Sequence, residues 1–179
     1  MKSLSQSDMI HSKKAERAGI SIKDIVLIAM LSAILVVVHV AIAALPNIEL
    51  VTLLIILYTL VFRWRTLPII YVYAVLQGLI YGFGPWWFMY LYVWTILYLI
   101  VTLLRKNKSV IIWSVVSGIY GLIFGALCSL VYFFLGGIHT VIAFWIAGIQ
   151  FDITHGIANF FICFVLFKPL YAILTKLKT

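Results

Sequence analysis

Long stretches without any charged side chain dominate this sequence. Residues 25–48, 50–62, 66–104, 109–151 and 153–167 contain no Asp, Glu, Lys or Arg. Only 10% of the residues are charged and 65% are hydrophobic, whereas an average soluble domain has about 25% charged residues. Such a chain has too few polar side chains to cover a soluble fold. We therefore exclude an ordinary cytoplasmic enzyme, a disordered chain and a nucleic-acid-binding module, and we predict an all-α integral membrane protein.

The lengths of these stretches predict six transmembrane helices. A spanning helix needs about 20 mostly apolar residues, and the two longest stretches are about twice that length. Each of the two contains a glycine-rich break, at residues 82–85 and at Gly136-Gly137. The predicted helices cover residues 24–45, 48–63, 66–83, 86–104, 109–135 and 141–168. Residues 1–20 are expected to form a flexible cytoplasmic tail, and residues 21–179 a single six-helix transmembrane domain.

The basic residues predict the orientation. With the N-terminus inside, all 13 Lys and Arg lie in the tail, just after it at Lys23, near 63–65, near 105–108 or at the C-terminal end. The connections near 45–47, 83–85 and 136–140 contain none. Basic residues collect in cytoplasmic loops, so both termini are predicted to be cytoplasmic. The net charge of +8 is thereby explained without a nucleic-acid partner.

The second predicted helix is short for a span. Residues 48–63 make about 24 Å of helix, against a hydrocarbon core of about 30 Å. Either the preceding loop dips into the membrane, with Glu49 below the surface, or the bilayer is locally thinned.

Polar side chains inside apolar segments are the candidates for function, because in lipid they must be paired or solvated. In the last predicted helix, Trp145, Asp152, His155 and Asn159 follow a three-to-four-residue spacing and are expected to share a face. Asp152 is predicted near mid-membrane, so it must be protonated, paired or hydrated. It either faces a ligand pocket or makes a helix–helix hydrogen bond, for example to His155. His39 is interpreted as a solitary helix histidine.

Aromatic residues crowd the predicted helix at 86–104. Trp86 and Trp87 fit an aromatic belt at the outer interface. Tyr90, Trp94 and Tyr98 continue toward the middle at a spacing of four. Their faces and polar tips suit a flat heterocycle, although helix packing explains the same spacing.

Small residues recur at helical spacing. Gly121 and Gly125 are expected to let their helix approach another helix of the bundle, and Ala29 and Ala33 form a similar pair on the first helix. The chain has no GxxxxGK[ST] phosphate loop and therefore cannot use ATP itself. Neither its histidines nor its two cysteines have a metal-site spacing, so no metal or other cofactor is expected.

Taken together, the segment 45–51 (LPNIELV), the stretch YGFG at 81–84, the stretch 86–94 and the alanine pair of the first helix resemble a known family. They are similar to the substrate-binding S components of energy-coupling factor (ECF) vitamin transporters, over about residues 22–175. The resemblance implies a multi-pass protein of a bacterial plasma membrane, not itself an enzyme, that captures a small vitamin near the outer side. It also implies a transmembrane partner subunit, contacted by Ala29 and Ala33, and two cytoplasmic ATPase subunits that use ATP.

The residues and the resemblance together favour one site. We expect it to be formed by Asn47, Glu49, Tyr90, Trp94, Trp145, Asp152, His155 and Asn159. Two carboxylates with aromatic walls favour a neutral or weakly basic ring with hydroxyls, of the pyridoxine or hydroxymethylpyrimidine class. Two alternatives remain: an intramembrane enzyme that uses Asp152 and His155 as an acid–base pair, and a non-transport membrane scaffold.

Overall fold

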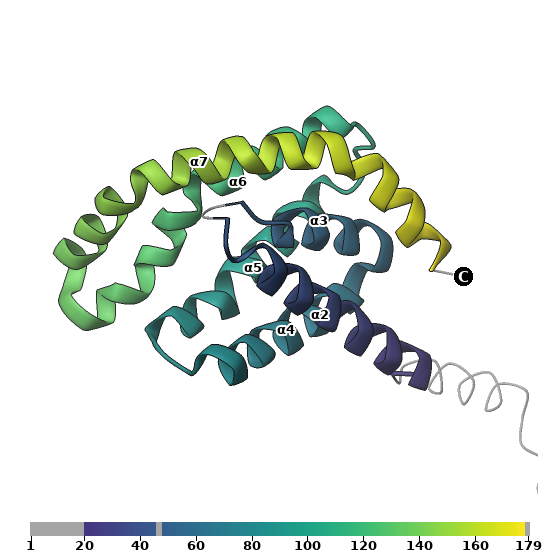
Figure 1. Ribbon diagram of the computed structural model, residues 1–179, viewed down its shortest axis with the longest axis horizontal. Helices are drawn as coiled ribbons and strands as arrows, with labels where there is room; N and C mark the ends of the chain where they lie inside the picture. Colours follow the sequence, from purple (N-terminus) through teal and green to yellow (C-terminus); the bar gives the residue numbers. More distant parts are fainter. Residues whose placement is uncertain (1–19, 46–47, 178–179) are drawn as a thin grey trace, which may run out of the picture.

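The computed structural model describes residues 20–45 and 48–177, and within these ranges the chain forms helices and no strand (Figure 1). The predicted tail up to residue 19 and Asn47 lie outside the described residues. The elements are α2 (Ile22–Ile42), α3 (Val51–Phe62), η1 (Arg63–Arg65), α4 (Thr66–Tyr81), α5 (Pro85–Leu104), α6 (Val110–Ser129), η2 (Leu130–Tyr132) and α7 (Phe133–Lys176).

By length and composition, four helical stretches of the described chain are able to cross a membrane. They are Ile22–Ile42, Val51–Tyr81, Pro85–Leu104 and Val110–Lys176. The second stretch joins α3 to α4, and the fourth joins α6 to α7. Apolar side chains cover much of the outer surface, which is the expected exterior of a protein surrounded by lipid.

The helix ends follow local sequence signals. Ser21 and Asp24 form a reciprocal capping box at the start of α2. Pro85 begins α5, where its missing N–H is not needed. At the predicted break, Gly137 has φ 67°, a conformation that L side chains rarely adopt, and it interrupts the helical geometry of α7. The first four predicted helices agree with α2 to α5 to within three residues at each end.

The last two predicted helices differ more from the structure. The predicted segment 109–135 ends as a regular helix at Ser129 and continues as the short η2. The final helix was predicted to end at 168, but α7 continues past Pro169 to Lys176. The prediction of its end was wrong because Leu174 is buried in the core and holds this last part of the helix in place.

Side-chain contacts define the relative directions of the helices. Asp24 pairs with Arg65 at the beginnings of α2 and α4, and His39 bonds Tyr73 farther along both, so these helices run parallel. Because α3 connects the end of α2 to the beginning of α4, it runs in the opposite direction. The neighbouring pairs α4–α5, α5–α6 and α6–α7 are antiparallel. The contacts that show this are Tyr71–Thr95 and Ala74–Trp87 between α4 and α5, Tyr92–Leu127 and Val93–Tyr120 between α5 and α6, and Gly121–Gly156 and Gly125–Asp152 between α6 and α7.

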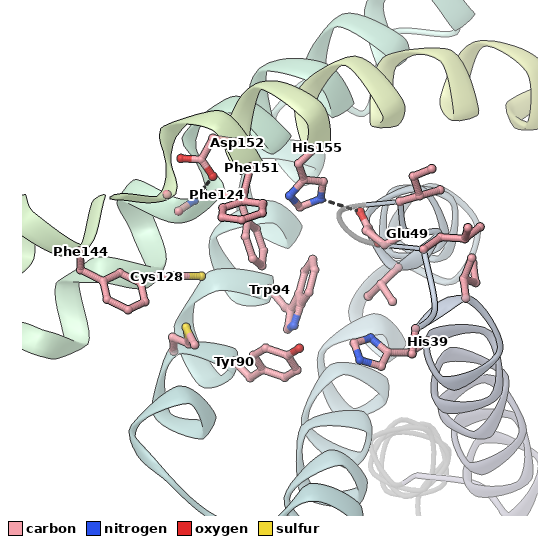
Figure 2. A pocket seen from close by; sticks show the side chains of 18 of the residues that line it. His39, Glu49, Tyr90, Trp94, Phe124, Cys128, Phe144, Phe151, Asp152 and His155 are labelled. Carbon is pink, nitrogen blue, oxygen red and sulfur yellow. Dashed lines mark hydrogen bonds and ion pairs between the residues drawn. The ribbon is translucent and has the colours of Figure 1, made fainter. Parts of the chain in front are cut away.

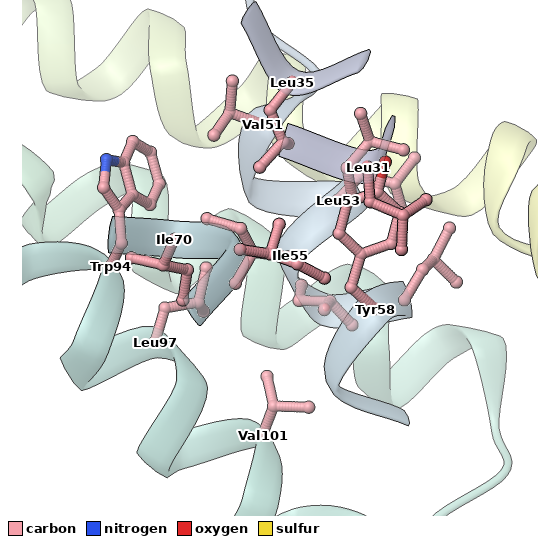
Figure 3. Packing of buried hydrophobic residues seen from close by; sticks show 14 of the residues in the cluster. Leu31, Leu35, Val51, Leu53, Ile55, Tyr58, Ile70, Trp94, Leu97 and Val101 are labelled. Carbon is pink, nitrogen blue, oxygen red and sulfur yellow. The ribbon is translucent and has the colours of Figure 1, made fainter. Parts of the chain in front are cut away.

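The helix α3 forms the centre of the molecule. Every one of its residues except Leu60 is buried, and it packs against α2, α4, α5 and α7. At about 1.5 Å per residue its 12 residues are about 18 Å long, which confirms a helix shorter than a normal span. Figure 3 shows Leu53, Ile55 and Tyr58 of α3 among side chains of the surrounding helices.

Glycines bring α6 and α7 into backbone contact. A Cβ added to Gly121 would lie 2.8 Å from the Cα of Gly156, closer than real Cβ contacts. At Gly125 a Cβ would lie 2.5 Å from both carboxylate oxygens of Asp152. The predicted partner of these small residues, another helix of the same bundle, is therefore confirmed, and Figure 1 shows α7 lying along α6.

Candidate functional site

A cavity of ≈ 670 Å³ lies between α2, α5, α6, α7 and the segment that precedes α3. Ligand pockets in proteins typically measure about 300–1,000 Å³. Figure 2 shows the side chains that surround it, which come from segments far apart in the sequence. The polar and aromatic members of its lining include His39, Glu49, Tyr90, Trp94, Asp152 and His155.

Glu49 joins three parts of this site. Its Oε2 accepts a hydrogen bond of 2.8 Å from the backbone N–H of Thr52, in the first turn of α3. Its Oε1 accepts a hydrogen bond of 3.2 Å from His155 Nε2 on α7. Burial raises the pKa of the Glu49 carboxyl, but the hydrogen bonds and the charge of His155, together with Thr52, outweigh burial and lower this pKa below its ordinary value. Glu49 is thus held as a carboxylate.

Asp152 is buried, with 6% of its surface exposed, and is only partly satisfied. Its Oδ1 accepts a hydrogen bond of 2.8 Å from the backbone N–H of Gly125 on α6. Its Oδ2 is buried and has no hydrogen-bond partner among the described residues. A buried carboxylate oxygen without a partner is costly, so this position favours a group that arrives from outside the chain.

A row of aromatic rings forms one wall of the cavity. The ring of Trp94 lies 5.9 Å from that of Tyr90 and 5.4 Å from that of Phe124. The ring of Phe124 lies 4.9 Å from the imidazole of His155. Trp94 is 3% exposed, and its indole N–H has no partner within the described chain. The wall therefore combines flat apolar faces with a buried indole N–H that has no partner among the described residues.

The row of rings continues to His39. Tyr73 stacks on Tyr90 with ring centroids 6.1 Å apart, and its hydroxyl is hydrogen-bonded to His39 Nδ1 at 3.1 Å. His39 lines the same cavity as Glu49. The sequence interpretation of His39 as a solitary helix histidine is therefore wrong, because tertiary packing gives it a partner on α4 and a place in the cavity.

Five of the eight predicted site residues are brought together. Glu49, Tyr90, Trp94, Asp152 and His155 all line the cavity. Two others stand apart from the lining: Trp145, with 42% of its surface exposed, and Asn159, buried one turn beyond His155 on α7. Asn47 lies outside the described residues.

The face of α7 that lines the cavity differs from the predicted one. It passes through Phe144, Ala147, Gly148 and Phe151 as well as Asp152 and His155, so Trp145 is on the neighbouring, outward face. From α6 the lining also includes Phe124 and Cys128, which the sequence did not single out. Apolar side chains carry no signal of their own in a chain of this composition, and only the spacing of four between Phe124 and Cys128 indicates a shared face.

The helix–helix hydrogen bond considered for Asp152 is confirmed, but the suggested partner, His155, is wrong. Asp152 is hydrogen-bonded to the α6 backbone, and His155 to Glu49, which is 106 positions away in sequence. No direct hydrogen bond joins these two side chains within the described chain. In the part of the chain that the structure describes, no group of three His, Cys, Asp or Glu side chains is arranged to hold a metal ion.

The cavity thus has the properties of a site for a small flat molecule: a suitable volume, aromatic walls and buried polar atoms that find no partner among the described residues. Comparisons of the chain with protein-family models, with curated proteins and with solved structures find no match in any of the three.

Proposed function

We propose that this chain is the substrate-binding S component of an ECF-type importer in a bacterial plasma membrane. It captures a small vitamin or vitamin precursor at the outer side and delivers it inward together with partner subunits. The observation that carries the proposal is the cavity of ≈ 670 Å³. Asp152 and Trp94 line it, and among the described residues their Oδ2 and Nε1 atoms are buried without hydrogen-bond partners. The resemblance of the segments 45–51 and 81–94 to this family supports the same function.

In this proposal the chain crosses the membrane six times, with both termini in the cytoplasm. The alternating directions of α2 to α7 support it, and so does the absence of Lys and Arg from three of the connections in the sequence. The cavity then opens toward the outer side, because it lies where α2 ends and α5 begins. The short α3 is enclosed by protein, so it does not need to match the thickness of the bilayer.

The proposed partners are a transmembrane subunit and two cytoplasmic ATPases, which supply the energy that this chain cannot obtain from ATP. Ala29 and Ala33 support the contact with the transmembrane subunit, because both are exposed on the outward face of α2. The double substitution of Ala29 and Ala33 by Trp should abolish complex formation and uptake, and spare ligand binding. Normal uptake by this variant would contradict the assignment to an ECF importer.

The direct test is mass spectrometry of small molecules released from gently purified protein. A ring compound with hydroxyls, of the pyridoxine or hydroxymethylpyrimidine class, is the expected result. The same compounds should then quench tryptophan fluorescence in titrations. Absence of any bound small molecule, together with no association with a transmembrane subunit, would instead favour a membrane scaffold.

Two matched tryptophan variants locate the site. Trp94→Phe should remove most of the ligand-dependent quenching, because Trp94 lies in the cavity wall. Trp145→Phe should leave it intact, because Trp145 is exposed on the outward face of α7. The same loss of quenching in both variants would place the ligand elsewhere.

A further inference from the structure

The lining of the cavity is unbalanced in charge. Two carboxylates, Glu49 and Asp152, belong to it, and its described residues include no Lys or Arg. The remaining ionisable side chains of the lining are His39, Tyr90, Cys128 and His155. A buried negative charge requires compensation, either from the protein or from whatever the cavity binds.

The carboxylate of Glu49 already has its compensation within the protein. One oxygen is bonded to His155 and the other to the N–H of Thr52 at the start of α3. The positive end of the helix dipole lies at that same position. Glu49 thus fixes the segment before α3 onto α7. Because both of its oxygens already have partners in the protein, it attracts a ligand only weakly.

The carboxylate of Asp152 is compensated on one side only. Gly125 N–H bonds Oδ1, whereas Oδ2 is buried without a partner. The backbone of α6 approaches so closely that a Cβ at Gly125 would lie 2.5 Å from both oxygens. This contact confines the carboxylate between α6 and α7, at a point where Asp152 lines the cavity with 6% of its surface exposed.

Aromatic rings surround the same space. Tyr90, Trp94, Phe124, Phe144 and Phe151 all belong to the lining. The faces of aromatic rings carry partial negative charge and attract cations placed within about 6 Å. The described lining offers an anion no Lys or Arg, and of its two histidines His155 is bonded to Glu49 and His39 to Tyr73. The aromatic walls and Asp152 therefore favour the same sign of charge in a ligand.

We propose that the ligand of this cavity is a cationic aromatic ring, whose positive nitrogen lies beside Asp152 and whose faces pack against the aromatic wall. This inference rests on the proposed function and narrows its substrate class from a ring with hydroxyls to a ring that binds in its positively charged form. A permanently charged ring or a protonated ring nitrogen meets this requirement equally well.

The test uses two probes of nearly identical shape. They are meta-hydroxymethyl-N-methylpyridinium, a permanent cation, and meta-methylbenzyl alcohol, in which carbon replaces the charged nitrogen. Binding of each is measured by calorimetry to the full chain in lipid nanodiscs, with empty nanodiscs as the reference for partitioning into lipid. The wild-type protein should prefer the cation by about tenfold or more. Equal affinity for the two probes, or a preference for the neutral one, would overturn the inference.

Two variants assign the preference to Asp152. Asp152→Asn removes the charge and keeps the shape, so it should lower the affinity for the cation by about tenfold and leave the affinity for the neutral probe unchanged. Asp24→Asn makes the same chemical change at the beginning of α2, outside the cavity, and should leave the preference intact. A preference that survives in Asp152→Asn would also overturn the inference.

The outcomes separate this inference from the proposed function. If pyridoxine or hydroxymethylpyrimidine binds in a neutral form and the pyridinium probe does not bind, the cavity is still a vitamin site but its ligand is not a cation. If a cation binds to the cavity and the Ala29, Ala33 double variant retains normal uptake, the charge inference stands and the ECF function fails. Failure of every compound to bind would overturn both.

Discussion

The close contact between α6 and α7 yields a prediction with a defined sign. Replacing Gly121 by Ala places a Cβ within 2.9 Å of three backbone atoms of α7, in Gly156 and His155. Backbone atoms cannot rotate away as a flexible side chain does, so the helices must separate by several tenths of an ångström. The matched control is Gly148→Ala on α7, where an added Cβ meets nothing within 4 Å.

The magnitudes follow from packing and helix propensity. Overpacking a core costs about 1–3 kcal/mol of stability. Because the added Cβ meets backbone atoms, we expect the cost for Gly121→Ala to be near the upper end of that range. Alanine is more favourable than glycine in a helix by about 1 kcal/mol, so the net loss in the free energy of unfolding is about 2 kcal/mol. For a chain of this length that lowers the unfolding midpoint by about 4–8 °C, whereas Gly148→Ala should raise it by about 2–4 °C.

The two native cysteines provide the assay. Cys128 and Cys163 are both buried, with exposures of 6% and 0%. A thiol-reactive fluorophore therefore reports unfolding of the detergent-solubilised protein without any introduced label. Equal midpoints for Gly121→Ala and Gly148→Ala, or a higher one for Gly121→Ala, would refute the reasoning that backbone contact limits the volume at position 121.

Two further predictions concern polar contacts. The pKa of Glu49 is lowered from its ordinary value near 4.5, so its contribution to stability is complete above that pH and is lost as the pH falls below it. Glu49→Gln should therefore reduce the loss of stability at acid pH, measured by circular dichroism as a function of pH. An unchanged loss of stability at acid pH would contradict this. The buried hydroxyl of Tyr120 donates to the carbonyl of Val93 and links α6 to α5, so Tyr120→Phe should cost about 1 kcal/mol in the same thiol assay. No loss of stability would show that this hydrogen bond makes no net contribution.

The positions of the helices were predictable because charged residues are rare in this chain and because the glycine-rich breaks fall inside long apolar stretches. Each break in the apolar stretches, such as Gly136-Gly137, is conspicuous against a uniformly apolar background. The rarity of charged residues also singled out Glu49 and Asp152, since an acidic side chain in an apolar segment is costly unless it is paired or solvated. Both line the cavity.

The partners of these residues were not predictable from spacing. His155 is three residues from Asp152 on one helix, yet it bonds Glu49, because the fold of α2 and α3 carries that side chain to α7. Phe124 and Cys128 were missed for a different reason. Their side chains are typical of every helix in this chain, and only the approach of α6 to α7 at Gly125 makes them part of a cavity wall.

The contact between Gly125 and Asp152 has an evolutionary consequence. Any side chain at position 125 would occupy the space of the carboxylate, since a Cβ there lies 2.5 Å from both of its oxygens. The two positions are therefore coupled: a side chain at 125 would force the Asp152 carboxylate to leave its present position, whereas glycine at 125 leaves room for it. Among descendants of a common ancestor, a larger residue at 125 should accompany a small or apolar residue at 152, together with a change in the ligand that the cavity accepts.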